Sequence, residues 1–145
     1  MLPGMFLWLS ANASAQIFVA CLLGWVMLLP MQPWGKRLKA TLPPTRAMLS
    51  AHLDFILLAL GQGLVAFVST RVDFAYPRTI AGLLVFGGWV NPLPYLFRSK
   101  GIDAFVMAGG ARQRLASALS GVSSAALTVA WGMVTVQLVL RACGR

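Results

Sequence analysis

The chain has 145 residues, of which 59% are hydrophobic and only 10% are charged. Soluble domains carry about a quarter charged residues, so this chain has too little polar surface to cover a water-soluble particle. Its 12 basic and 3 acidic residues give a net charge of +9, but the basic residues fall between apolar runs, so we expect them to face anionic lipid headgroups and not nucleic acid.

Two apolar stretches in the first half of the chain are long enough to cross the hydrocarbon core, which takes about 20 residues. The first predicted helix runs from about residue 5 to 29 and ends at Pro30. A basic, proline-containing loop follows, because proline cannot continue a helix. The second predicted helix runs from about 47 to 70, with Thr45 as its candidate N-cap.

The third predicted helix, from about 79 to 97, is the least regular because Pro92 and Pro94 fall within it. Prolines at membrane depth free backbone groups that neighbouring helices, side chains or water must satisfy. A polar loop follows, and the fourth helix runs from about 115 to 140. We therefore predict an all-α fold in which residues 1–145 form a single four-helix transmembrane domain.

The loops and termini predict how the chain is oriented and in which membrane it lies. Lys and Arg are more numerous in the first and third loops than in the second loop and the C-terminal end, which favours both termini outside. The N-terminus lacks the positive stretch of a secretory signal, so we expect the first helix to be retained. Cys21 and Cys143 provide neither a disulfide framework nor a metal cluster. We expect a multi-pass protein of a bacterial inner membrane.

Small residues recur at helical spacing on the fourth helix, at Ser117, Gly121, Ser124 and Thr128. Inside lipid, such residues let two helix backbones approach closely. We interpret this stripe as a packing face, within the chain or between chains, in preference to a substrate groove.

Polar side chains inside apolar helices are costly and are therefore candidate functional groups. They are His52, Asp54 and Gln62 on the second helix, Trp89, Asn91 and Tyr95 on the third, and Asn12 and Gln137 on the other two. For Gln62 and Gln137 we expect hydrogen bonds between helices. For Asp54, which lies on a different helix face from His52, we expect a pairing with Arg46 or with another chain.

His52 is the only histidine of the chain and lies about two turns inside the second helix. One hypothesis makes it a hydrogen-bonded interfacial histidine, and the other makes it a metal or haem ligand. A single histidine is too few for tetrahedral zinc or for a haem with two histidine ligands. It suffices for a five-coordinate haem whose opposite face is open.

Asn91 and Tyr95 are four residues apart, so they share a helix face if the prolines leave the turn intact. An amide and a phenol on one face would hydrogen-bond an oxygen-bearing substrate. Alternatively, they satisfy backbone groups freed by Pro92 and Pro94. Trp89 serves equally well as an interfacial anchor.

Two stretches carry a resemblance to a known family. Residues 49–54 read Leu-Ser-Ala-His-Leu-Asp, and residues 88–97 read Gly-Trp-Val-Asn-Pro-Leu-Pro-Tyr-Leu-Phe. The first resembles Ser-Ala-His-Leu-Glu of hydroxylaminobenzene mutases. The second resembles Gly-Trp-x-Asn-x-x-x-Tyr-Leu-Phe of the membrane isomerases that include these mutases and styrene-oxide isomerase. The four-helix layout and the length agree as well.

The resemblance implies a homotrimer with haem b near the subunit interfaces and a small aromatic or apolar substrate. His52 matches the axial histidine, and Tyr95 matches the tyrosine that contacts the substrate oxygen across from the iron. We assign iron ligation to His52, cofactor binding to His52 and Trp89, and catalysis to Tyr95 and Asn91. In the family, ferric haem acts as a Lewis acid that turns an aryl epoxide into an aldehyde, and arylhydroxylamines become aminophenols.

The chain also departs from the family pattern. Leu58 replaces an asparagine six residues after the axial histidine, Gly87 replaces an aspartate of styrene-oxide isomerase, and Asn12 stands where relatives carry a histidine. The loss of an amide at Leu58 removes a hydrogen bond worth about 0.5–1.5 kcal/mol. We therefore expect haem binding to persist in a more apolar pocket, with a substrate that the sequence does not identify.

Three other functions compete with the haem isomerase. One is haem-dependent N–O chemistry in a specialised pathway, and another is a non-enzymatic membrane subunit or anchor. The third is a small four-helix transporter, for which a membrane-embedded carboxylate would serve as the coupling site. Asp54 is the one candidate for that role, which counts against this hypothesis.

Overall fold

The computed structural model describes residues 3–35, 37, 41–42, 45–97, 102, 104–106 and 109–144. This part of the chain is helical and contains no strand. The elements in chain order are α1 (Pro3–Leu28), the 3-10 turn η1 (Leu29–Met31), α2 (Thr45–Val68), α3 (Pro77–Val90), α4 (Leu93–Phe97) and α5 (Ala111–Ala142).

The described residues contain four helical segments that are long and apolar enough to cross a membrane, as predicted. They cover Gly4–Met31, Thr45–Val68, Pro77–Phe97 and Ala111–Ala142. The second segment begins at Thr45 itself, so this residue is the first helical one and not the cap that the sequence suggested. The expected architecture of a multi-pass membrane protein is therefore supported.

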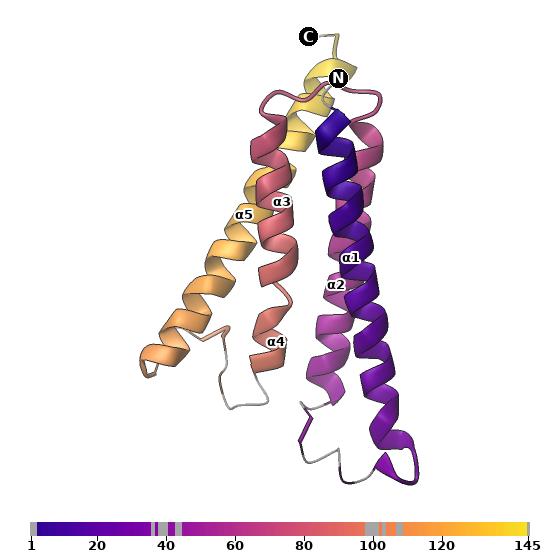
Figure 1. The fold of residues 1–145 in the computed structure, drawn as a ribbon. Helices are drawn as coiled ribbons and strands as arrows, with labels where there is room; N and C mark the ends of the chain where they lie inside the picture. Colours follow the sequence, from indigo (N-terminus) through magenta and orange to yellow (C-terminus); the bar gives the residue numbers. More distant parts are fainter. Residues whose placement is uncertain are drawn as a thin grey trace.

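The helices pack as two pairs, α1 along α2 and α3 along α5, and α4 continues the direction of α3 (Figure 1). The two chain termini lie at the same end of the bundle (Figure 1). An even number of crossings requires this arrangement. The linker from α2 to α3 lies at that end too, which we call the terminal end.

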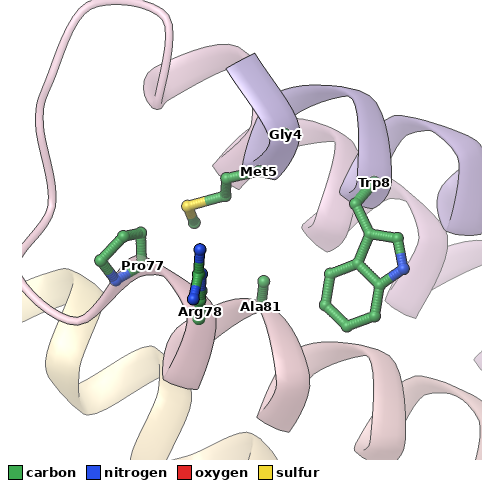
Figure 2. A pocket seen from close by; sticks show the side chains of 6 residues that line it. All are labelled: Gly4, Met5, Trp8, Pro77, Arg78 and Ala81. Atoms are coloured by element: carbon green, nitrogen blue, oxygen red, sulfur yellow. The ribbon is translucent and has the colours of Figure 1, made fainter. Parts of the chain in front are cut away.

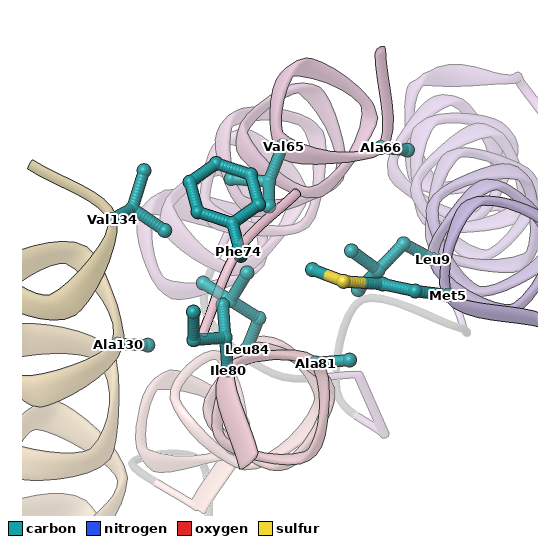
Figure 3. Packing of buried hydrophobic residues seen from close by; sticks show 10 residues of the cluster. All are labelled: Met5, Leu9, Val65, Ala66, Phe74, Ile80, Ala81, Leu84, Ala130 and Val134. Atoms are coloured by element: carbon teal, nitrogen blue, oxygen red, sulfur yellow. The ribbon is translucent and has the colours of Figure 1, made fainter. Parts of the chain in front are cut away.

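A cluster of buried apolar residues joins the helices at the terminal end (Figure 3). Leu9, Ile80 and Leu84 are its fully buried large side chains. The other members are Met5, Val65, Ala66, Phe74, Ala81, Ala130 and Val134. Because α1, α2, α3, α5 and the α2–α3 linker all contribute, this cluster sets the relative positions of both helix pairs.

Small side chains occupy much of the buried surface, and large apolar side chains point outward. Ala51 and Ala130 are fully buried, whereas Trp25, Leu57 and Phe67 are 61–70% exposed. A water-soluble bundle would show the opposite pattern, since it hides large apolar side chains in its core. The outward side chains suit contact with lipid or with another helix of the assembly.

The third predicted helix is irregular as expected. α3 ends at Val90, and α4 begins at Leu93 after a turn at Asn91 and Pro92. Proline has no N–H. Pro92 therefore cannot donate a hydrogen bond to the carbonyl of Gly88, and Pro94 cannot donate one to the carbonyl of Val90. The break therefore follows directly from the two prolines.

The packing face of α5 differs from the predicted stripe. Ser117 is buried, but Gly121, Ser124 and Thr128 are exposed, so the stripe is not a packing face within the chain. The residues of α5 that are buried instead are Ala116, Ser117, Ser120, Ser123, Ala126, Ala130 and Val134. Ser123 and Leu127 lie on the side of α5 that faces Gly87, where α3 comes close.

Gly87 lies where α3 and α5 come closest. A Cβ atom added there would stand 2.4 Å from Cγ of Leu127 and 3.2 Å from the backbone oxygen of Ser123. An aspartate at this position, as in styrene-oxide isomerase, would require the two helices to move apart. The glycine is therefore a condition of this α3–α5 contact.

We expect Gly87→Ala to lower the free energy of unfolding by about 1–3 kcal/mol, the usual cost of overpacking a tight contact. Thermal unfolding in mild detergent measures the effect. Gly82→Ala on the same helix is the matched control, because no atom lies within 4 Å of its added Cβ. That control should be neutral or slightly stabilising. Equal stability of the two variants would contradict the close contact.

Candidate functional site

His52 lies on α2 and turns its half-buried ring toward α1. Its Nδ1 is 2.7 Å from the backbone oxygen of Ala20. A carbonyl oxygen only accepts hydrogen bonds, so Nδ1 must be the protonated nitrogen. In the neutral ring, Nε2 then carries the lone pair, which is the form that binds a metal.

The neighbourhood of His52 allows α1 to come close. A Cβ atom on Gly24 would stand 3.5 Å from Cε1 of the imidazole, in ordinary contact. Within the described part of the chain, no residue hydrogen-bonds Nε2. The ring is thus fixed through one nitrogen, while the other has no protein partner among these residues.

Asp54 is turned to the opposite side of α2, because two residues correspond to about 200° around a helix. Its Oδ2 accepts a hydrogen bond of 3.0 Å from Nδ2 of Asn91. The expected pairing with Arg46 is therefore wrong for the single chain. Arg46 lies about two turns before Asp54 on the same helix, whereas Asn91 reaches the carboxylate from the third membrane-spanning segment.

Asn91 connects three segments of the bundle. Its Nδ2 donates to Asp54 on α2, and its Oδ1 accepts from the hydroxyls of Ser124 at 3.1 Å and Ser123 at 3.4 Å on α5. These partners are side chains, so Asn91 does not use its amide on the backbone groups freed by the prolines. One N–H of the amide is left without a described partner.

Trp89 points its indole into the bundle. Its Nε1 donates to Oδ1 of Asn12 on α1 at 3.2 Å, and its ring meets that of Phe55 on α2 edge-on, with centroids 5.9 Å apart. The alternative of an interfacial anchor does not fit a tryptophan whose N–H is bonded between helices. Asn12 on α1 therefore holds this indole in place.

Tyr95 lies on α4, beyond the proline break. Its ring packs against Phe105, with centroids 5.3 Å apart and an interplanar angle of 51°. Because the helix breaks at Asn91, the shared face expected for Asn91 and Tyr95 does not form as one helical turn. The amide contacts α2 and α5, whereas the phenol ring contacts the segment that precedes α5.

The two remaining candidate glutamines make contacts outside this group. Gln62 Nε2 donates to the carbonyl of Leu84 at 3.2 Å, which confirms a hydrogen bond between helices. Gln137 bonds the backbone of Ala75 through both side-chain atoms, so it ties α5 to the α2–α3 linker and not to a second helix. Both serve the architecture.

Gln16 was not among the predicted candidates, although it too is a polar side chain inside an apolar helix. It is fully buried on α1, and neither of its amide atoms has a described partner. A Cβ on Gly88 would stand 2.5 Å from its Nε2 and 2.3 Å from Nε2 of Gln62. The glycine of the Gly-Trp pair therefore makes room for two amides in the middle of the bundle.

Within one chain, the candidate residues form two groups on opposite sides of α2. His52 faces α1, and Asp54 faces Asn91 with the α5 serines. Among the described residues, no cluster of three or more His, Cys, Asp or Glu side chains could hold a metal. A metal that brings most of its own ligands, as iron does in a porphyrin, needs only one from the protein.

Comparison with known proteins gives no match: no family model, no curated protein and no solved structure is similar to this chain.

We expect Asp54 and Asn91 to be energetically coupled. A double-mutant cycle with Asp54→Ala and Asn91→Ala, followed by unfolding in detergent, should give a coupling of about 0.6–1.7 kcal/mol, the range found between membrane helices. A cycle of Asp54→Ala with Ser69→Ala is the control, since Ser69 bonds only its own helix, at Ala66. Additive effects in the first cycle would contradict the bond.

Proposed function

We propose that this chain is a haem b-dependent isomerase of the membrane, resident in a bacterial inner membrane. The observation that carries the proposal is that Nδ1 of His52 bonds the Ala20 carbonyl at 2.7 Å while its Nε2 has no partner among the described residues. In metal-binding histidines, the second ring nitrogen almost always donates to a carboxylate, a carbonyl or water, which fixes the tautomer and raises the basicity of the ligating nitrogen. His52 has the bond from Nδ1, and Nε2 would be the ligating atom.

The residues present fit the cofactor. His52 would supply the protein ligand to the iron, and Trp89 would offer an aromatic wall. When bound, a ferric haem would supply a Lewis acid that withdraws electron density from a substrate oxygen. His52, the only histidine of the chain, would be the single imidazole available to hold that iron.

The chain's own polar groups would orient the substrate. Asn91 has its carbonyl oxygen occupied by serine hydroxyls and one N–H by Asp54, so its second N–H is available to a substrate oxygen. Tyr95 would hold a proton on its phenol oxygen, close to where negative charge develops. Hydrogen bonds of this kind speed a reaction when they strengthen in the transition state.

The homotrimer belongs to the proposal for a geometric reason. In one chain, the imidazole faces α1, whereas Asn91 lies on the other side of α2. A haem on His52 would meet the amide and phenol most directly if they came from a neighbouring subunit. The large apolar side chains that point outward from α1 and α2, such as Leu22, Leu53 and Leu57, provide the surface for such an assembly.

The proposed substrate class rests on the resemblance of residues 49–54 and 88–97 to the membrane isomerases. The reaction is a rearrangement of an aryl epoxide to an aldehyde, or of an arylhydroxylamine to an aminophenol, and the product has the mass of the substrate. Leu58 replaces an amide by an apolar side chain, so the substrate would carry one hydrogen-bonding oxygen and an otherwise apolar body. Water and a second polar substituent would be disfavoured there.

We expect the purified protein to be coloured, with a Soret band that His52→Ala weakens or abolishes. His52→Gln is the matched control for folding, because its amide still offers a donor to the Ala20 carbonyl but no imidazole. Added imidazole should restore part of the band in His52→Ala, since it can replace the missing ligand. Colourless protein from haem-replete cells would overturn the proposal.

We expect Tyr95→Phe to keep the Soret band and to lower turnover by about a hundredfold to a thousandfold, the usual loss on removing one hydrogen-bond donor from a transition state. Turnover is measured with an aryl epoxide and an arylhydroxylamine, and product mass shows whether the reaction is an isomerisation. Tyr76→Phe is the control, because Tyr76 is exposed in the α2–α3 linker. Unchanged turnover in Tyr95→Phe would exclude a catalytic phenol.

A further inference from the structure

A pocket of about 380 Å³ opens at the terminal end of the bundle, between the first turns of α1 and α3 (Figure 2). Six residues line it: Gly4, Met5, Trp8, Pro77, Arg78 and Ala81. It is separate from His52, which lies near the other ends of α1 and α2. The proposed isomerase therefore makes no use of it.

The walls of the pocket are apolar on both helices. Met5 and Ala81 are buried parts of the core cluster, and Trp8 is 47% exposed at the side. Arg78 is the one charged residue that lines the pocket, and Figure 2 shows its side chain beside Met5 and Pro77. The pocket thus combines one permanent cation with a surface that suits alkyl chains.

The Arg78 guanidinium has no partner in the part of the chain that the structure describes. A guanidinium presents five N–H donors in a planar fork that matches the geometry of a phosphate. An unpaired guanidinium beside an apolar pocket therefore suits a lipid whose anionic headgroup binds the guanidinium and whose acyl chains contact the apolar residues of the pocket.

The level of the pocket in the membrane indicates that the anionic group belongs to a lipid of the bilayer. Gly4 and Pro77 are the first residues of two candidate membrane spans, so the pocket lies where the apolar helices leave the hydrocarbon. At that level the phosphates of the bilayer surround the protein, and tryptophan is enriched there. A lipid reaches this position by lateral diffusion without leaving the membrane.

We propose that the Arg78 pocket is a binding site for an anionic phospholipid, with the phosphate on the Arg78 guanidinium and an acyl chain along Met5, Trp8 and Ala81. An anionic lipid at this site would also offset part of the net charge of +9 that the chain carries. The bound lipid would hold the starts of α1 and α3 together.

The test compares lipids on the detergent-purified full chain by native mass spectrometry. Wild-type protein should retain phosphatidylglycerol in preference to phosphatidylcholine, and Arg78→Gln should reduce that preference about fivefold, as expected for one basic residue at a membrane surface. Arg71→Gln is the matched control, since Arg71 is exposed in the linker at the same end but does not line the pocket. It should keep the preference.

A second variant tests the apolar half of the site without touching its charge. Gly4 lines the pocket, and a Cβ added there meets no atom within 4 Å, so Gly4→Leu adds bulk at the pocket wall and should also reduce retained phosphatidylglycerol. Gly132→Leu, on the open surface of α5, is the control for added bulk.

Several results would overturn the proposal. They are equal retention of the two phospholipids by the wild type, an equal loss in Arg78→Gln and Arg71→Gln, and unchanged retention in Gly4→Leu. Stronger retention of oleate than of phosphatidylglycerol would instead identify a carboxylate ligand and would overturn the phospholipid as the occupant.

Discussion

The hydrogen bonds of Asn91 are the interaction on which much of the bundle depends. In lipid, no water is available to hydrogen-bond a polar group. A group without a protein partner therefore destabilises the fold. Two prolines interrupt the third transmembrane segment next to Asn91, and its side chain bonds Asp54 on α2 and two serines on α5. The Asn91 amide thus links the third segment to α2 and α5 at the point where two prolines remove backbone hydrogen bonds.

The same constraint explains why small residues lie inside. Without a hydrophobic drive between helices, association depends on close packing and on hydrogen bonds. Gly87 admits Leu127, and Gly88 admits two glutamine amides. Large apolar side chains are then left for the outer surface, where lipid or a neighbouring subunit contacts them.

The parts of this structure that the sequence predicted are those governed by length and local chemistry. The four spans follow from apolar length, and the break after Val90 follows from Pro92, which cannot donate a backbone hydrogen bond. The separation of His52 from Asp54 follows from helical periodicity. Each of these needs only the residues close by in the chain.

The parts that escaped prediction depend on which helices become neighbours. The stripe from Ser117 to Thr128 has the correct spacing for packing, but the approach of α3 at Gly87 selects the face that contains Ser123. Asp54 was expected to use a nearby basic residue, whereas its partner, Asn91, is 37 positions away. Spacing along one helix cannot specify such contacts.

The histidine shows how local geometry narrows a functional hypothesis. A hydrogen-bonded interfacial imidazole and an iron ligand both require a partner for one ring nitrogen, and the Ala20 carbonyl meets that need in either case. The two hypotheses differ in the partner that they give to the second ring nitrogen, Nε2. A structural histidine in lipid would gain from a second bond, because an unmet polar atom is costly there. Among the described residues Nε2 has no partner, so it is available to the iron that the proposed function requires.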